Sequence, residues 1–153
     1  MSEDYRLHRL IQAHEGKRLL AYDDATGETI KPGYTMIGNP TIGIGRNLLG
    51  KGITGIEALL LMENDILECV LDLHRIFYDF GSLSTARQDA LADMRFTLGP
   101  AGFRKFEKMI GAIIEKDWLD AANEVRESNW FKGPAKKRAE LAAVMIGSGQ
   151  YPA

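Results

Sequence analysis

Residues 14–45 read HEGKRLLAYDDATGETIKPGYTMIGNPTIGIG and have the most distinctive pattern in the chain. Glycine, proline and asparagine recur in it at short intervals, between strand-forming residues such as Tyr22, Ile30 and Ile42. Turn residues between β-branched and aromatic residues predict two or three short strands joined by tight turns. The stretch therefore predicts a small antiparallel sheet, with residues 31–34 at the tip of a hairpin.

Helical periodicity precedes and follows this stretch. Before it, Leu7, Leu10 and Ile11 recur at helical spacing and predict a short amphipathic helix over residues 3–14 that ends near Gly16. After it, a Thr-x-x-Glu capping box opens a long helix over residues 54–77. Further start and stop signals predict a cluster of shorter helices: Thr85 with Gln88, Gly99-Pro100, the apolar positions between 106 and 114, Asp117, and Pro134.

These elements predict the α+β class, built as one domain over residues 1–153 with two lobes. The sheet lobe is expected at about residues 16–53, and the larger helical lobe at residues 1–15 and 78–153. Residues 54–77 form the helix that joins them. A cleft between the two lobes is the expected place for a site.

Composition places the chain among ordinary globular proteins, with 153 residues, 45% hydrophobic and 26% charged. A net charge of −2 provides no field that would attract nucleic acid. The first twenty residues carry charges throughout, so we expect no signal peptide and no membrane-spanning segment, and synthesis in a cytoplasm. The single cysteine, Cys69, is expected to be a small core residue.

Two acids have the surroundings that acid–base chemistry needs. Glu15 lies at the end of the first predicted helix, where the helix dipole disfavours a charged carboxylate and so suits a proton donor. Asp24 lies in a turn nine residues later, and Thr41 opens the strand that follows. Different surroundings give two carboxyl groups different roles at one pH. The spacing alone also fits two solvated surface carboxylates.

Other candidate residues favour structural roles. His8, His14 and His74 lack metal-ligand spacing, so no metal is expected. His74 lies on the long predicted helix beside Asp72 and Arg75, where we expect a solvated face. Trp118 and Trp130 are able to stack on sugars, but their helical context predicts core residues first.

The order of these motifs resembles that of the phage-type lysozymes, particularly the T-even kind. The resemblance covers roughly residues 7–149. It rests on His14-Glu15-Gly16, Leu19, Ala21-Tyr22-Asp23-Asp24, Gly27 and Thr41-Ile42-Gly43-Ile44-Gly45, and continues through Ile53-Thr54, Glu57-Ala58, Met94, Phe96, Gly99, Gly102-Phe103, Trp118, Ala121-Ala122, Trp130 and Arg138-Ala139.

The resemblance implies a lysozyme-like fold and a muramidase that cleaves between N-acetylmuramic acid and N-acetylglucosamine in peptidoglycan. Glu15 would protonate the glycosidic oxygen, while Asp24 and Thr41 would hold a water on the opposite face of the sugar. That route inverts the anomeric carbon and requires the two carboxyl groups to stand about 6.5 to 9.5 Å apart. No cofactor is expected, and the protein is expected to act as a monomer on glycan strands.

The resemblance also implies two pairings. Arg138 matches an arginine that positions the catalytic glutamate, although an ordinary surface arginine is an equal alternative. Arg46 stands where relatives have a histidine, so an Arg46–Asp65 ion pair is expected to replace a histidine–aspartate pair. One departure is a longer segment between Asp24 and Thr41, so details of sugar binding do not carry over from the T-even kind.

The implied setting is lysis of a bacterial host by a phage or prophage endolysin, which would need a holin or similar route from the cytoplasm to the cell wall. Two rivals remain. One is a non-catalytic wall-binding or virion-structural module on the same fold, favoured by the acidic pI of about 5.9. The other is hydrolysis of chitin-like polymers by the same residues.

Overall fold

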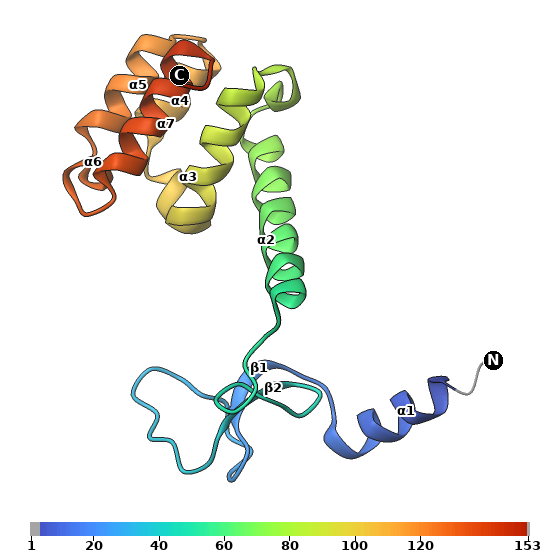
Figure 1. Cartoon of the computed structure of the whole chain (residues 1–153). Coiled ribbons are helices and arrows are strands. Elements are labelled where there is room, and N and C mark those ends of the chain that lie inside the picture. The colour runs from blue at the N-terminus through green and yellow to red at the C-terminus, as the bar shows by residue number, and fades with distance from the viewer. Residues whose placement is uncertain (1–3, 153) are drawn as a thin grey trace. The chain divides into compact units, whose positions relative to one another are not determined.

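The computed structural model describes residues 4–152, and the chain divides into two compact units, residues 1–59 and 60–153 (Figure 1). The α+β class predicted from the sequence is confirmed. The first unit contains α1 (Asp4–Glu15), β1 (Arg18–Asp23), β2 (Pro40–Gly43), β3 (Arg46–Asn47) and the start of α2 (Gly55–Ile76). The predicted grouping of residues 1–15 with the helical lobe concerns the relation between the units and stays a prediction.

The sheet is antiparallel, with strand order β1-β2-β3, so β2 is the central strand. Thr41 on β2 pairs with Tyr22 on β1 and with Asn47 on β3, and its side chain is buried. This matches the predicted strand that Thr41 opens. The pairing of Asp23 with Pro40 brings the end of β1 next to the start of β2, although the two residues are seventeen positions apart in the sequence.

The long segment between β1 and β2 is a loop with a turn at its predicted tip. The Tyr34 N–H donates to the Lys31 carbonyl at 2.9 Å, which closes the turn over residues 31–34. The chain on either side of this turn, between β1 and β2, does not form the paired strands of a hairpin. An isolated β-bridge joins Tyr22 and Thr29. Hydrogen bonds to the side chains of Asp23 and Asp24 hold this loop instead.

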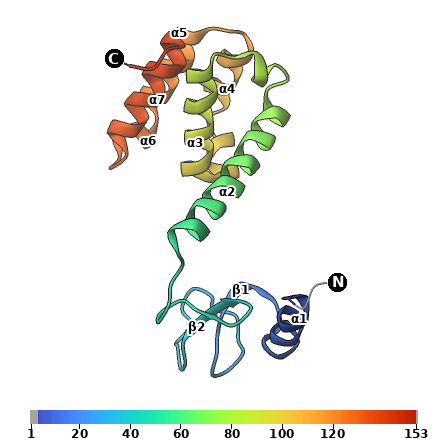
Figure 2. The same ribbon diagram turned by 45° about the vertical axis from the view of Figure 1, so that its right-hand side comes forward.

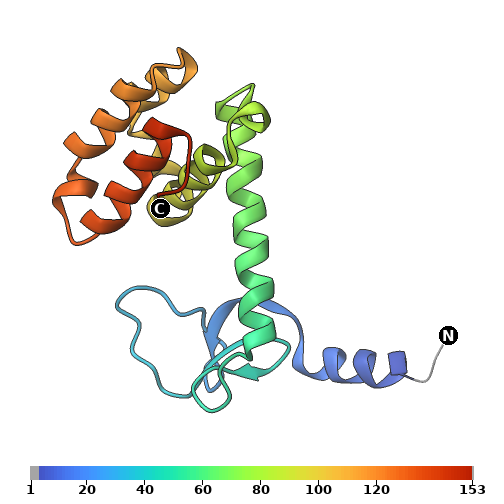
Figure 3. The same cartoon turned by 45° about the horizontal axis from the view of Figure 1, so that its top comes forward.

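The predicted capping box opens α2. The Glu57 N–H donates to Thr54 Oγ1 at 3.2 Å, and the Thr54 N–H donates to Glu57 Oε2 at 2.7 Å. Two backbone donors at the helix start are thus satisfied. The helix then continues without interruption, close to the predicted residues 54–77 (Figure 3).

The second unit is a cluster of helices that follows the rest of α2. It contains the short 3-10 helix η1 (Phe80–Ser82), α3 (Thr85–Arg104), α4 (Glu107–Ile114), α5 (Trp118–Glu127), α6 (Asn129–Lys132) and α7 (Lys136–Ser148). Helices α5 and α7 lie side by side (Figures 1 and 2). Their small residues, among them Ala121 and Ala142, are buried in one core with Met94, Phe103 and Ile146. Cys69 is buried as predicted.

One local prediction for the helical unit is wrong, and one short helix was missed. The cap of α3 is Ser84 and not Thr85, because Ser84 Oγ accepts the Arg87 N–H while Gln88 donates its amide to the Leu83 carbonyl at 2.7 Å. Helix α6 was not predicted. The predicted stop at Gly99-Pro100 is confirmed, since Gly99 has φ +69° and breaks the helix before a further helical turn that ends at Arg104.

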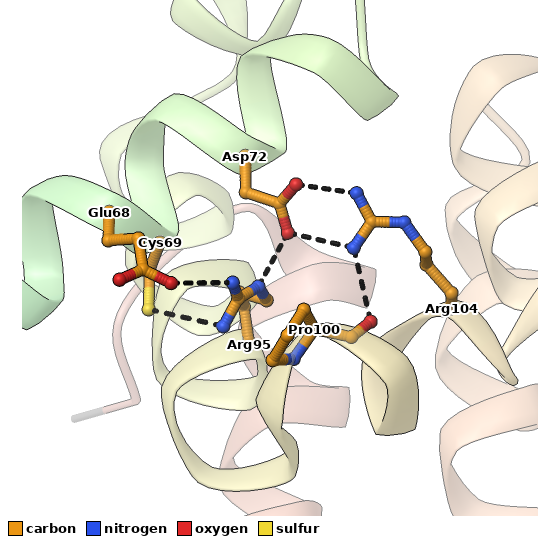
Figure 4. A network of polar contacts seen from close by, with 6 residues as sticks. All are labelled: Glu68, Cys69, Asp72, Arg95, Pro100 and Arg104. Atoms are coloured by element: carbon orange, nitrogen blue, oxygen red, sulfur yellow. Dashed lines mark hydrogen bonds and ion pairs between the residues drawn. The ribbon is translucent and has the colours of Figure 1, made fainter.

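His74 and Arg75 are exposed, as expected for a solvated helix face. Asp72 next to them differs, because it is 6% exposed and takes part in a buried charge network (Figure 4). Its Oδ2 accepts from Arg95 Nε at 2.6 Å and from Arg104 Nη1 at 2.9 Å. Arg95 is itself buried and reaches Glu68 and the Cys69 sulfur. The hydrogen bonds from Arg104 and then from Arg95 hold the pKa of the Asp72 carboxyl well below its usual range. The network ties α2 to α3.

Candidate active site

Glu15 is the last residue of α1, as the sequence predicted for the proton donor. The helix ends there because Gly16 has φ +70°, a left-handed conformation that a helix cannot continue through, while its N–H still donates to the Gln12 carbonyl at 2.9 Å. The carboxyl group therefore emerges at the end of a helix and beside the sheet of its own unit.

The Glu15 carboxyl lies directly against the backbone of Gly45, in the turn between β2 and β3. A Cβ atom built on Gly45 would come within 2.4 Å of Glu15 Oε2 and 2.9 Å of Glu15 Cδ. Such distances are well inside van der Waals contact, so any side chain at this position would have to displace the carboxyl group. Gly45 also has φ +68°, a conformation that other residues adopt at a cost. The absence of a side chain at Gly45 thus leaves the space that the Glu15 carboxyl group occupies.

Replacing Gly45 with alanine is expected to displace the Glu15 carboxyl and to lower kcat by about tenfold or more, since a misplacement of about 1 Å can cost a hundredfold. Gly43→Ala is the matched control. Gly43 has φ +69°, and no heavy atom lies within 4 Å of its Cβ position. Both variants should lose similar stability on thermal unfolding, but only Gly45→Ala should lose turnover. Equal loss of activity in both would refute the steric explanation.

Asp24 and Thr41 are joined through one residue, Asn39. Asp24 Oδ1 accepts the Asn39 N–H at 2.7 Å, and Asp24 Oδ2 accepts from Asn39 Nδ2 at 3.2 Å. The Asn39 carbonyl accepts the Asp24 N–H at 3.1 Å and the Thr41 hydroxyl at 3.3 Å. The sequence did not single out Asn39. It fixes both predicted water-binding groups relative to each other.

All three predicted catalytic residues therefore gather around the segment from residue 41 to residue 45. Thr41 opens this segment with Asp24 beside it, and Gly45 closes it with the Glu15 carboxyl against its backbone. The Thr41 hydroxyl, with a hydrogen-bonded carboxylate and a second carboxyl group lying against the same short segment, provides the functional groups of a general acid and a water-binding pair. The catalytic roles themselves stay predictions.

Sequence reasoning missed Asp23, the buried neighbour of Asp24. Its side chain is 0% exposed and accepts hydrogen bonds from backbone N–H groups of the loop. The only signal in the sequence was the doubled acid after Tyr22. Nothing in that pattern tells which of the two aspartates turns inward.

Arg46 is bound inside its own unit to Glu57. Its Nη1 and Nη2 donate to the two carboxylate oxygens at 3.0 and 2.6 Å, and Nη1 also reaches the Gly52 carbonyl. The capping-box glutamate thus has a second role that the sequence analysis did not assign. The predicted Arg46–Asp65 pair would join the two units and stays a prediction.

The Glu57 carboxylate stabilises the folded first unit, and this contribution is lost at low pH. The Thr54 N–H, followed by Arg46, lowers the pKa of the Glu57 carboxyl from 4.5 to about 2. A carboxyl with a lowered pKa in the folded state stabilises the protein above its unfolded pKa, and this contribution disappears as the pH falls. The melting temperature of Glu57→Gln should therefore lie below that of the natural chain above pH 4.5 and approach it near pH 2. A difference independent of pH would contradict this.

Arg138 pairs with Asp93 in the helical unit. Its Nε donates to Asp93 Oδ2 at 2.8 Å, and its Nη2 contacts Asp93 Oδ1. The two hydrogen bonds hold the guanidinium in a fixed, forked arrangement. Asp93 was not anticipated as its partner. The predicted pairing of Arg138 with Glu15 would join the two units and stays a prediction.

Within residues 4–152, no group of three or more histidine, cysteine, aspartate or glutamate side chains is arranged to hold a metal ion. His74 lies on the exposed side of α2 with its ring against Phe80. Trp118 and Trp130 are partly buried against the helical core, as predicted. None of the helices in this part of the chain is long and apolar enough to cross a membrane.

Comparison with known proteins gives a family match and several relatives. The family model for phage lysozyme matches residues 12–143. The chain is 29% identical over 157 residues to the pre-baseplate central spike protein Gp5 of Enterobacteria phage T4, covering 92% of this chain and 27% of that protein. It is 26% identical over 158 residues to probable T4-type lysozyme 2 of Dictyostelium discoideum, covering 84% of this chain and 91% of that protein. The chain thus spans about a quarter of the spike protein.

Proposed function

Because this chain belongs to the phage lysozyme family, we propose that it hydrolyses peptidoglycan at the β-1,4 bond between N-acetylmuramic acid and N-acetylglucosamine. The observation that carries this proposal is the gathering of Glu15, Asp24 and Thr41 around residues 41–45, which form most of β2 and the turn after it. A fold alone does not specify an activity, so the arrangement of these groups is the stronger support.

The proposed reaction is a single displacement. Glu15 donates its proton to the glycosidic oxygen as the bond breaks. The Thr41 hydroxyl donates its own hydrogen to the Asn39 carbonyl, which leaves its oxygen free to accept a hydrogen from water. Asp24 retains lone pairs beyond its two bonds to Asn39 and takes the second proton of that water. Attack from the face opposite the leaving group inverts the anomeric carbon.

Every step of this mechanism is assigned to side chains of the first unit, and it needs no metal or cofactor. We further propose that the protein acts as a monomeric endolysin of a phage or prophage. It would be made in the host cytoplasm and reach the wall through a holin or a similar route. Arg138 would position Glu15 from the helical unit, and an Arg46–Asp65 contact would be structural.

A second candidate function is a non-catalytic, virion-structural or wall-binding module. It is favoured by the 29% identity to a protein named as a phage central spike and by the acidic pI of about 5.9. The presence of Glu15, Asp24 and Thr41 together, each held in place, favours the enzyme, because a module that only binds has no need of all three.

Product analysis tests the proposed function. Purified peptidoglycan and chitin are each incubated with the protein, and the new reducing ends are converted to sugar alcohols with borohydride. A muramidase should yield muramitol from peptidoglycan and little product from chitin. Glucosaminitol from peptidoglycan would place the cleavage at the other bond, and equal rates on chitin would favour a chitin-like substrate. Binding to peptidoglycan without any new reducing end would favour the structural module.

A further inference from the structure

The buried carboxylate of Asp23 is the centre of the long loop between β1 and β2. Its Oδ1 accepts the N–H groups of Ala25 at 3.0 Å and Gly38 at 2.9 Å. Its Oδ2 accepts the Ile37 N–H at 2.7 Å and the Tyr34 hydroxyl at 3.3 Å. A carboxylate with no exposed surface is stable as an ion only when it is hydrogen-bonded, and here four donors serve it. Both ends of the loop are thus tied to one side chain.

The same loop backbone also holds Asp24. Three consecutive N–H groups, those of Ile37, Gly38 and Asn39, point at two consecutive carboxylates. Asp23 takes the first two, and Asp24 takes the third at 2.7 Å. The planar peptide unit that carries the Asn39 N–H begins at the Cα atom of Gly38, so a shift of Gly38 moves the N–H that holds Asp24.

The space around Gly38 shows how closely the two carboxylates converge. A Cβ atom on Gly38 would lie 2.2 Å from Asp24 Oδ1 and 2.7 Å from Asp23 Oδ1. Gly38 does not have a left-handed conformation, so lack of space is what requires glycine there. Gly38 therefore lies closely between the carboxylate of Asp24, which is assigned to catalysis, and the buried carboxylate of Asp23.

The environment also distinguishes the two aspartates chemically. The Ile37 N–H, with those of Ala25 and Gly38, holds the pKa of Asp23 below its usual range, so Asp23 stays ionised. Its two oxygens are occupied by four donors, and its side chain has no exposed surface. Asp23 is thus unsuited to bind the attacking water itself and suited to hold its neighbour.

We propose that Asp23 is a positioning residue, which fixes the backbone of residues 37–39 and through it the orientation of the Asp24 carboxylate. The inference rests on the proposed function, in which Asp24 orients the attacking water. It assigns the long loop a role in the chemistry, because that loop supplies the donors that lock Asp24 in place.

The test is a set of kinetic measurements on soluble peptidoglycan fragments with the full chain. Asp23→Asn keeps the shape of the side chain but replaces one acceptor oxygen with an NH₂ group. It should lower kcat by about tenfold to a hundredfold, with KM changed by less than about twofold. Gly38→Ala should do the same by displacing Asp24. Gly55→Ala is the control, since nothing lies within 4 Å of that Cβ position and the backbone is not left-handed.

A double-mutant cycle separates positioning from a general structural role. If Asp23 acts through Asp24, Asp23→Asn should cost little further activity in an Asp24→Asn background. Losses that multiply, or a rise in KM with kcat unchanged, would overturn the proposal. Tyr34→Phe removes the longest of the four hydrogen bonds to Asp23, together with the hydrogen bond between the Tyr34 and Thr26 hydroxyls, and keeps the test valid if Asp23→Asn does not fold. It should lower kcat by about twofold or more without changing KM, and an unchanged kcat would count against Asp23.

The natural chain distinguishes the two possible failures. If it shows no hydrolysis at all, the proposed function fails, and the role of Asp23 fails with it. If the natural chain is active and a folded Asp23→Asn variant is equally active, only the positioning role is wrong.

Discussion

Replacing Glu15 with glutamine is expected to lower the rate of peptidoglycan hydrolysis by about a hundredfold to ten-thousandfold, the range that general acid catalysis supplies. Glutamine has nearly the same shape as glutamate, so it should occupy the same place against Gly45 without a clash. It has no acidic proton to give to the leaving oxygen. The measurement is the initial rate of reducing-end release from purified peptidoglycan, followed across the pH range.

Glu28→Gln is the control for this variant. Glu28 is an exposed acid of the same unit, and its side chain is assigned no catalytic role. Thermal unfolding should give the same melting temperature for the natural chain and Glu15→Gln. If folded Glu15→Gln retained more than about a tenth of the natural rate, the general acid would have to be another residue.

The second large effect is expected on stability, in the buried charge network of the helical unit. Asp72→Ala should lower the free energy of unfolding by about 3–5 kcal/mol, because it leaves the buried Arg95 guanidinium without its main partner. Arg104 is half exposed and can turn to water, so it adds little to this cost. Glu63→Ala, an exposed acid on the same helix, should change stability by less than about 0.5 kcal/mol.

A double variant checks the cause of that loss. Asp72→Leu combined with Arg95→Met removes both buried charges and should recover most of the stability, since apolar residues of similar size replace a buried pair with little loss. Thermal or urea unfolding monitored by circular dichroism measures all of these variants. If Asp72→Ala were as stable as the natural chain, the network would make no net contribution to the packing of α2 on α3.

The sequence predicted those features that depend on neighbours along the chain. The capping box of Thr54 and Glu57 forms as expected, and the glycine-rich stretch forms the sheet with Thr41 on its central strand. Such signals are local, because a helix cap needs a donor and an acceptor three residues apart. The Glu15 position at the end of α1 followed from the same kind of signal.

Features that depend on partners distant in the chain could not be predicted. Asp23 and Asp24 are adjacent and chemically identical, and only the folded loop shows that the first turns inward. Asp72 has the helical context of a surface residue until Arg95, twenty-three positions later, is folded against it. Arg46 binds Glu57 in its own unit. The helix cap uses one carboxylate oxygen of Glu57, which leaves the other oxygen for Arg46.

The most direct test of the central claim, that this chain lyses cell walls with Glu15 as proton donor, is the loss of turbidity of outer-membrane-permeabilised Gram-negative cells. The natural chain and Glu15→Gln are compared at matched concentration and low salt, after both have been shown to be folded. Clearing by the natural chain alone is the predicted result. Clearing by both would contradict the role of Glu15, and clearing by neither would contradict the proposed activity.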